Sequence, residues 1–129
     1  MLPEDEIVRV CSLVVATATG IDPLAHIETR KGCAKLQYSR ALWVHLVVCE
    51  MNVSRGRASY LCERSLESID RDLLEVEEWR DDGEFSEKLD RWAESAKSLM
   101  ALIFDFARLT PSRRTRQVAR AVINERAVA

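Results

Sequence analysis

The sequence predicts an all-α protein organised around two short amphipathic helices, and three observations predict it. The chain of 129 residues contains only three prolines and four glycines, which leaves little material for the many turns of a β protein. Apolar residues recur at helical spacing along most of the chain. Two adjacent short segments each follow a serine that can cap a helix, and a polar turn joins them, as in a helix-turn-helix.

Composition narrows the class of protein further. Apolar residues make up 47% of the chain and charged residues 31%, as in globular domains, and the length suffices for one core. The longest apolar run, Ala41 to Cys49, is shorter than the roughly 18 residues of a membrane helix. The acidic start MLPEDEIV does not resemble a signal peptide. We therefore expect a cytoplasmic protein that has no membrane contact.

The residue types that carry catalysis or bind metals do not form a pattern. The sequence has no glycine-rich phosphate loop, no nucleophile beside a base, and no Cys-x-x-Cys pair near a histidine. We therefore expect no catalytic residue, no metal and no cofactor. The thiols are expected to be buried and reduced, with redox sensing as the alternative. The residues concerned are Cys11, Cys33, Cys49, Cys62, His26 and His45.

The first helix is expected from Glu4 to Thr19. Pro3 can begin it, acidic residues occupy its first turn, and Gly20 ends it. Asp22 then caps a short helix that runs from Pro23 to about Ile27.

A basic loop, Glu28 to Lys35, leads into a helix from about Leu36 to Met51. The middle of this helix is apolar all round, which predicts a position at the centre of the fold. Trp43 lies there, and His45 is expected to be a hydrogen-bonded core residue rather than a ligand.

The paired short helices come next. Ser54 caps the first, in which Ala58, Leu61 and Cys62 share one face. The polar break Glu63-Arg64-Ser65 separates it from the second, which Ser65 caps. In the second helix an apolar stripe faces the core at Leu66, Ile69, Leu73 and Val76.

A long helix is expected from Glu84 to about Leu109. Seven of its apolar positions form a heptad-like seam that either packs along the domain or pairs with a second copy. Because its last part is apolar almost all round, we favour a subunit or partner interface at Leu99, Ile103 and Phe106. We assign residues 1–82 to the helix-turn-helix domain and residues 83–129 to a helical extension for packing or dimerisation.

The extension ends in a basic amphipathic helix that begins at Thr110-Pro111. Arg113, Arg116 and Arg120 share one face of it, either as a solvated surface or as a contact for phosphate or an acidic partner. The acidic residues lie elsewhere, since Glu63 to Glu94 contains 13 acids against 5 bases. A nucleic-acid binder usually has a basic reading surface instead.

Several segments between Val14 and Asp82 resemble, in order, the C-terminal DNA-binding domain of the bacterial replication initiator DnaA and its small stand-alone relatives. ATGIDPLAHIETRKG is similar to the family's opening segment and basic loop. SRALWVHL is similar to its A-R-Q-x-A-M-Y-L helix, with Arg40 on the motif arginine. NVSRGRASYLCE is similar to L-S-x-x-E-I-G-x-x-F-G, and ERSLESI falls on the signature G-R-D-H-T-T-V without a gap. The resemblance implies a DnaA C-terminal or Trp-repressor-like fold and double-stranded DNA as the partner.

The chain departs from the signature where the family contacts bases in the major groove. Arg64 keeps the arginine, but Ser65, Leu66 and Glu67 replace aspartate, histidine and the first threonine, and Glu63 replaces the turn glycine. Leu66 either meets a thymine methyl group or extends the core stripe, and we favour the core. Two further acids, Asp70 and Asp72, are expected where the helix would approach phosphates.

Our first hypothesis is a small DNA-binding regulator of transcription whose recognition helix spans about Ser65 to Trp79. The long helix would make it a homodimer that binds two half-sites about one helical turn apart. Basic residues would hold the phosphates, at Arg30, Lys31, Arg40, Arg55 and Arg57. The base edges would be read by Arg64, Glu67, Ser68 and Arg71.

The alternative hypothesis is a protein-interaction adaptor or antiactivator. It keeps the fold, but its acidic helix, Glu67 to Asp82, and its apolar long helix bind a transcription regulator or RNA polymerase instead of DNA. The acidic segment and the altered signature favour this alternative.

Overall fold

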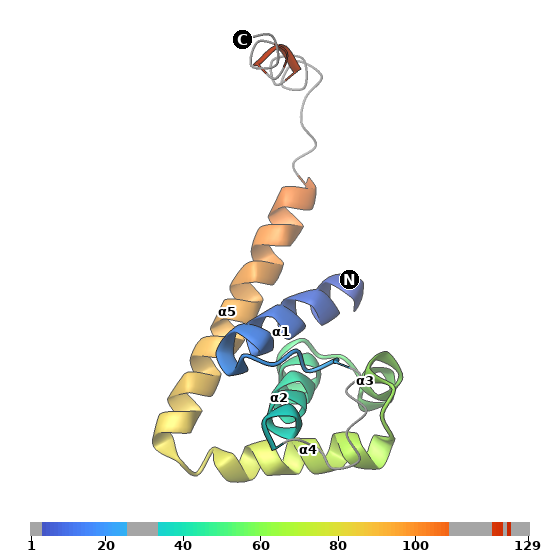
Figure 1. Ribbon diagram of the computed structural model, residues 1–129, viewed down its shortest axis with the longest axis vertical. Coiled ribbons are helices and arrows are strands. Elements are labelled where there is room, and N and C mark those ends of the chain that lie inside the picture. Colours follow the sequence, from blue (N-terminus) through green and yellow to red (C-terminus); the bar gives the residue numbers. More distant parts are fainter. Residues whose placement is uncertain (1–3, 26–33, 109–119, 123, 125–129) are drawn as a thin grey trace.

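The computed structural model describes residues 4–25, 34–108, 120–122 and 124. Its main elements are α1 (Glu4–Thr19), α2 (Ala34–His45), the π-helical segment η1 (Leu46–Glu50), α3 (Arg55–Cys62), α4 (Leu66–Trp79) and α5 (Gly83–Arg108) (Figure 1). No strand occurs in these ranges, so the predicted all-α class is confirmed. Arg30, Lys31 and the expected start of the final helix lie outside the described residues.

α2 and η1 form one continuous helix through the centre of the molecule. α1 and α4 pack against α2, while α3 and α5 pack against η1. Because neighbours cover it on several sides, every residue from Ala41 to Val47 is buried, and Trp43 is only 1% exposed. The predicted central helix is therefore confirmed. After His45 the helix widens to a π-helical turn, in which Met51 N donates to Leu46 O at 3.0 Å. The apolar pattern did not predict this turn.

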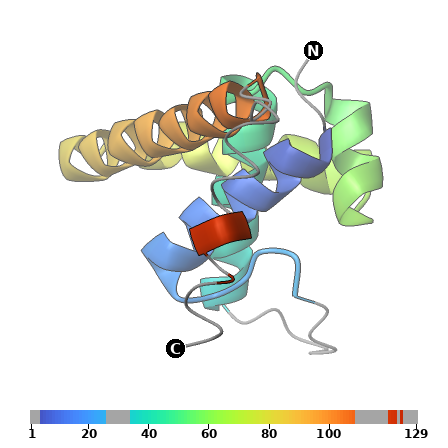
Figure 2. The same cartoon turned by 90° about the horizontal axis from the view of Figure 1, so that it is seen from above.

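α4 runs along one edge of the molecule, with α3 at its N-terminal end and α5 rising from its C-terminal end (Figure 1). The view from above places α3 and α5 on opposite sides of α2 (Figure 2). α4 therefore has one long face against α2 and another that is turned away from the body.

α5 belongs, as far as Met100, to the same core as the rest of the chain. Leu89, Ala93, Ala96 and Met100 are at most 4% exposed and join the cluster formed by α1, α2 and η1. The seam predicted in the long helix thus packs along the domain, and the boundary at residue 82 does not divide the core. None of the described helices is both long and apolar enough to cross a membrane.

The segment after α1 differs from its prediction. Gly20 has a φ of 79°, a left-handed conformation that suits glycine at a helix end. The Asp22 side chain makes the expected capping bond, since it accepts from Leu24 N at 2.9 Å. Residues 22–25 nevertheless form a turn and not the start of a helix at Pro23. α2 also begins two residues earlier than expected, at Ala34.

The three cysteines in the described ranges are free, but only one of them is buried. Cys11 lies in the core with 0% exposure, Cys62 is half-buried and Cys49 is exposed. The expectation of uniformly buried thiols is therefore wrong at Cys49, which lies on the outer side of η1.

His45 is buried, as predicted, but it lacks the expected hydrogen bond. It is 2% exposed, and neither ring nitrogen has a hydrogen-bond partner among the described residues. Its Nε2 lies 3.8 Å from Glu50 Oε1. Burial lowers the pKa of His45, the charge of Arg80 lowers it further, and Glu50 opposes the shift.

We predict that this histidine makes the fold less stable in acid. Its ordinary pKa is about 6.5, so below that pH the unfolded chain binds a proton that the folded chain does not bind. The free energy of unfolding therefore falls as pH decreases below about 6.5, by at most about 1.4 kcal/mol for each unit by which the pKa is lowered. Urea unfolding at pH 7.5 and pH 5.5 checks this, with His45→Met as the comparison. An equal acid-induced loss in both proteins would contradict it.

Candidate interaction surface of the α3 and α4 pair

The connection between α3 and α4 is fixed by local hydrogen bonds. Ser54 caps α3 by accepting from Arg57 N at 3.1 Å, and Ser65 caps α4 by accepting from Ser68 N at 3.2 Å. Both predicted caps are confirmed. Glu63 ends α3 in the left-handed region with a φ of 55°, a conformation in which a non-glycine residue costs roughly 1–2 kcal/mol. Three residues thus turn the chain from one helix into the next.

A buried polar network holds this turn against α2. The carboxylate of Asp72 is 0% exposed. It accepts one hydrogen bond from Nη1 of Arg64 at 2.5 Å and another from Nε2 of Gln37 at 2.8 Å. The Arg64 side chain is itself only 15% exposed. Two expectations are therefore corrected. Arg64 does not present its guanidinium to base edges, because the buried carboxylate holds it, and Asp72 does not face phosphates.

The two arginines of α3 are also paired with carboxylates, but in solvent. Arg55 Nη1 lies 2.5 Å from Asp70 Oδ1, and Arg57 Nε lies 2.5 Å from Glu4 Oε2. Arg57 also stacks over the Tyr60 ring, 4.7 Å from its centroid. Such exposed pairs contribute little to stability, so these side chains can still change partner. As folded, however, each positive charge is neutralised.

The other predicted phosphate contacts do not extend this surface. Arg40 is half-buried on α2, and its Nη2 is 3.5 Å from Ala25 O. It lines a small cavity together with Trp43 and Arg64, on the inner side of the turn. Arg40, Arg55 and Arg57 therefore do not form one exposed basic ridge. Arg30 and Lys31 lie outside the described residues.

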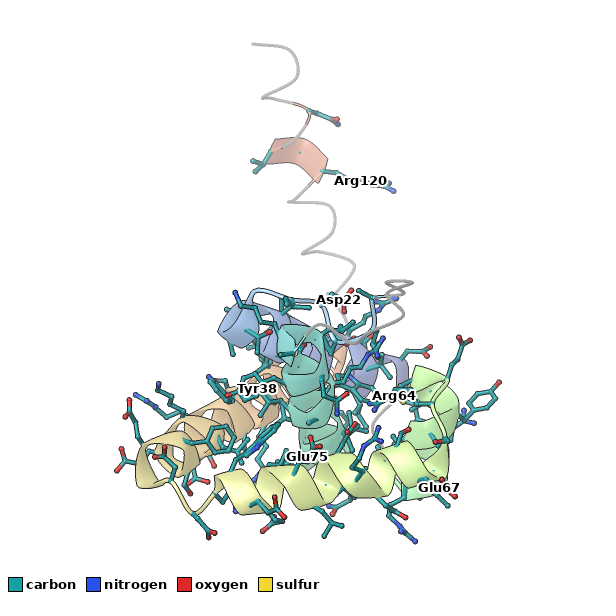
Figure 3. The ribbon with its side chains drawn as sticks, turned by 60° about the horizontal axis from the view of Figure 1, so that its bottom comes forward. Asp22, Tyr38, Arg64, Glu67, Glu75 and Arg120 are labelled. Atoms are coloured by element: carbon teal, nitrogen blue, oxygen red, sulfur yellow. The ribbon has the colours of Figure 1, made fainter. Side chains whose placement is uncertain are left out.

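The face of α4 that is turned away from the core is acidic. Arg71 is its exposed cation, and it makes no ion pair within the described ranges. Leu74, near the middle of this face, is 67% exposed. Glu67 lies at the end near α3 (Figure 3). We call this surface the outer face of α4. It consists of Glu67, Asp70, Arg71, Leu74, Glu77 and Glu78.

Two further side chains near the start of α4 have predicted roles. Leu66 is 44% exposed, so it does not extend the core stripe, which is carried by Ile69 and Val76 at 0% exposure. Ser68 is half-buried, and its Oγ lies 2.9 Å from Ser65 Oγ. Ser68 thus takes part in the cap of α4, and its role in reading bases stays a prediction.

The predicted interface on the long helix faces the body of the protein. Leu99 and Ile103 are partly buried and pack against the core, because α1 lies along this part of α5. The side chain of Phe106 lies outside the described residues. Leu102 is 65% exposed instead, one position away from the predicted face. Self-association through this helix stays a prediction.

The described side chains present carboxylates and apolar groups, with no cluster of three or more potential metal ligands among them. The arrangement can bind a complementary surface by charge and by apolar contact. Comparison with known proteins finds no family model, no curated protein and no solved structure that matches this chain.

Proposed function

We propose that this protein is an interaction module, of the adaptor or antiactivator kind, which binds a protein partner through the outer face of α4. The observation that carries the proposal is the charge of that face. Three glutamates, Glu67, Glu77 and Glu78, lie around the exposed Leu74, Asp70 is paired with Arg55, and Arg71 is the one cation among the described residues of this face. A partner that fits has a basic surface with an apolar socket. A transcription regulator or RNA polymerase offers such a surface where it contacts DNA.

The negative charge of the same face disfavours binding to nucleic acid. Lysine and arginine contacts to phosphate supply essentially all non-specific affinity for DNA, and a carboxylate at the same position repels the backbone. Arg55 and Arg57, the residues best placed to compensate, are each paired with an acid at 2.5 Å. Arg64 is held by a buried one.

A DNA-binding regulator is the second candidate, and the connection of the two helices favours it. α3 and α4 are joined by three residues, a turn length typical of a helix-turn-helix, and the sequence of this region resembles the DnaA C-terminal domain. The exposed Glu67 and Arg71 would then contact bases. Arg55 and Arg57 would leave their ion pairs with Asp70 and Glu4 and bind phosphates instead. Glutamate can accept from the cytosine N4 amino group, so an acid in the recognition helix is compatible with sequence reading.

One pair of measurements separates the two candidates. We expect fluorescence polarisation with a random duplex to give a dissociation constant weaker than about 10⁻⁴ M at physiological salt, beyond the ordinary non-specific range. We also expect a photo-crosslinking amino acid at Leu74 to capture one protein in cells. The same group at Glu94, on α5, is the control and should not capture it. Binding to the duplex within the ordinary range, lost in an Arg55→Ala and Arg71→Ala double variant, would favour the DNA-binding candidate.

A further inference from the structure

Three aromatic rings from different helices meet at the corner where α4 turns into α5. The centroid of Tyr38, on α2, is 5.2 Å from that of Trp79 and 6.3 Å from that of Phe85. Trp79 and Phe85 stand edge to face at 5.9 Å. These rings are only partly buried, so the corner presents aromatic surface to solvent. Figure 3 shows Tyr38 on the side of α2 opposite to Arg64, away from the α3 turn.

The rings line an open groove of about 500 Å³, a volume within the range of small-ligand pockets. Its wall is mostly apolar, and two of its polar residues are Asp82, which is an acceptor, and Gln37, which donates to acids. Asp82 is exposed, and its Oδ1 caps α5 by accepting from Glu84 N at 2.9 Å, so Oδ2 can accept another donor. Gln37 connects the groove to Glu75, with Nε2 3.5 Å from Glu75 Oε2. The lining residues are Ala34, Gln37, Tyr38, Trp79, Asp82 and Phe85.

We propose that this aromatic groove binds an arginine side chain of a basic protein segment. The inference rests on the proposed function, because it gives the partner of the acidic helix a defined anchor. An arginine has an apolar stem that fits aromatic walls and a planar cation that stacks on ring faces. Its guanidinium can also donate a charge-assisted hydrogen bond to a carboxylate oxygen, here Oδ2 of Asp82.

The charges around the groove favour a cation over an apolar anchor. Asp82 lines the groove, Glu75 lies next to it, and Asp81 is exposed in the turn that follows α4. The positive charge of Arg80 is neutralised by an ion pair with Asp90, whose Oδ1 lies 3.2 Å from Arg80 Nη2. Lys35 is exposed beside the groove on α2 but does not line it. An arginine would therefore meet a negative rim, whereas a leucine or phenylalanine would gain only the apolar contact.

The test uses hexa-arginine as the probe and hexa-citrulline, its neutral isostere, as the control peptide. Nuclear magnetic resonance of the full chain follows the indole N–H of Trp79, assigned by Trp79→Phe. We expect hexa-arginine to shift this signal in a saturable manner and hexa-citrulline to bind at least tenfold more weakly, as the loss of a charge-assisted hydrogen bond implies. Equal affinity for both peptides would overturn the proposal.

Matched variants separate the groove from general acidity. Glu75→Gln with Asp82→Asn removes two charges at the groove, and asparagine keeps the cap of α5 because it caps helices as well as aspartate does. Glu67→Gln with Glu77→Gln removes two charges from the outer face of α4 and leaves the groove intact. We expect the first pair to weaken hexa-arginine binding about tenfold and the second to change it less than threefold. Tyr38→Leu should weaken it as well, by removing one ring face.

The outcomes distinguish this inference from the proposed function. If the outer-face pair weakens binding as much as the groove pair does, the peptide recognises diffuse charge and the groove is not the anchor. In that case partner capture at Leu74 still supports the proposed function. If the groove pair alone weakens binding while the crosslinker at Leu74 captures nothing, the groove stands and the proposed function fails.

Discussion

Replacing Arg64 with methionine is expected to lower the free energy of unfolding by about 3–5 kcal/mol. The substitution leaves the Asp72 carboxylate 0% exposed with Gln37 as its remaining partner, and an uncompensated charge in a protein interior is strongly unfavourable. Urea unfolding followed by circular dichroism measures the change. If Arg64 instead read bases, its removal would leave stability nearly unchanged.

Two control variants make this result specific. Arg55→Met breaks the exposed pair with Asp70 and should cost less than about 1 kcal/mol, because that pair is solvated. Arg64→Met combined with Asp72→Leu should recover most of the lost stability, since replacing a whole buried pair with apolar residues is often neutral. A double variant as unstable as the single one would show that Arg64 acts by packing and not by compensating the carboxylate.

Local signals in the sequence predicted the helices well. Ser54 and Ser65 cap α3 and α4 as expected, because an N-cap bond involves only residues two or three positions apart. The apolar run around Trp43 likewise predicted a buried central helix. The π-helical turn of η1 was missed because it leaves no mark in apolar spacing. His45, the last residue of α2, is buried as expected but lacks the expected hydrogen bond.

The candidate site was harder to predict, because charge pairing joins residues far apart in the chain. Glu4 is 53 positions from Arg57, and no periodicity indicates that they meet. One signal was available: Asp72 lies between Ile69 and Val76 on the buried stripe of α4, where an acid requires a cation. Arg64, eight positions earlier, is that cation.

The long helix shows a different limit of sequence reasoning. A heptad-like seam predicts that one face is covered, but the pattern is the same whether the cover is another helix of the chain or a second copy. Here the body of the domain covers the face that contains Leu89 and Ala96. The aromatic groove was missed for a related reason, since Tyr38 comes from α2, about forty positions before Trp79.

Reversing the charge of the outer face of α4 is expected to create DNA binding. The variant replaces Glu67, Glu77 and Glu78 with lysine, which changes the net charge by +6 and places three cations on an exposed helix surface. If each lysine neutralises one phosphate, the slope of log K against log salt becomes steeper by up to about 2.7. We expect at least a hundredfold gain in affinity for a random duplex at low salt, measured by fluorescence polarisation.

The control for this gain is the same change of net charge elsewhere. Asp5, Glu87 and Glu94 are exposed on α1 and α5, away from the outer face. Their replacement by lysine should raise affinity less, because these residues lie on two helices and do not share one helix face. A larger gain at the outer face would mean that α3 and α4 can dock on DNA as a helix pair and that the three glutamates exclude nucleic acid from them. Equal gains would mean that affinity for DNA depends only on the net charge of the protein. The outer face of α4 would then be no better a DNA-binding surface than α1 or α5.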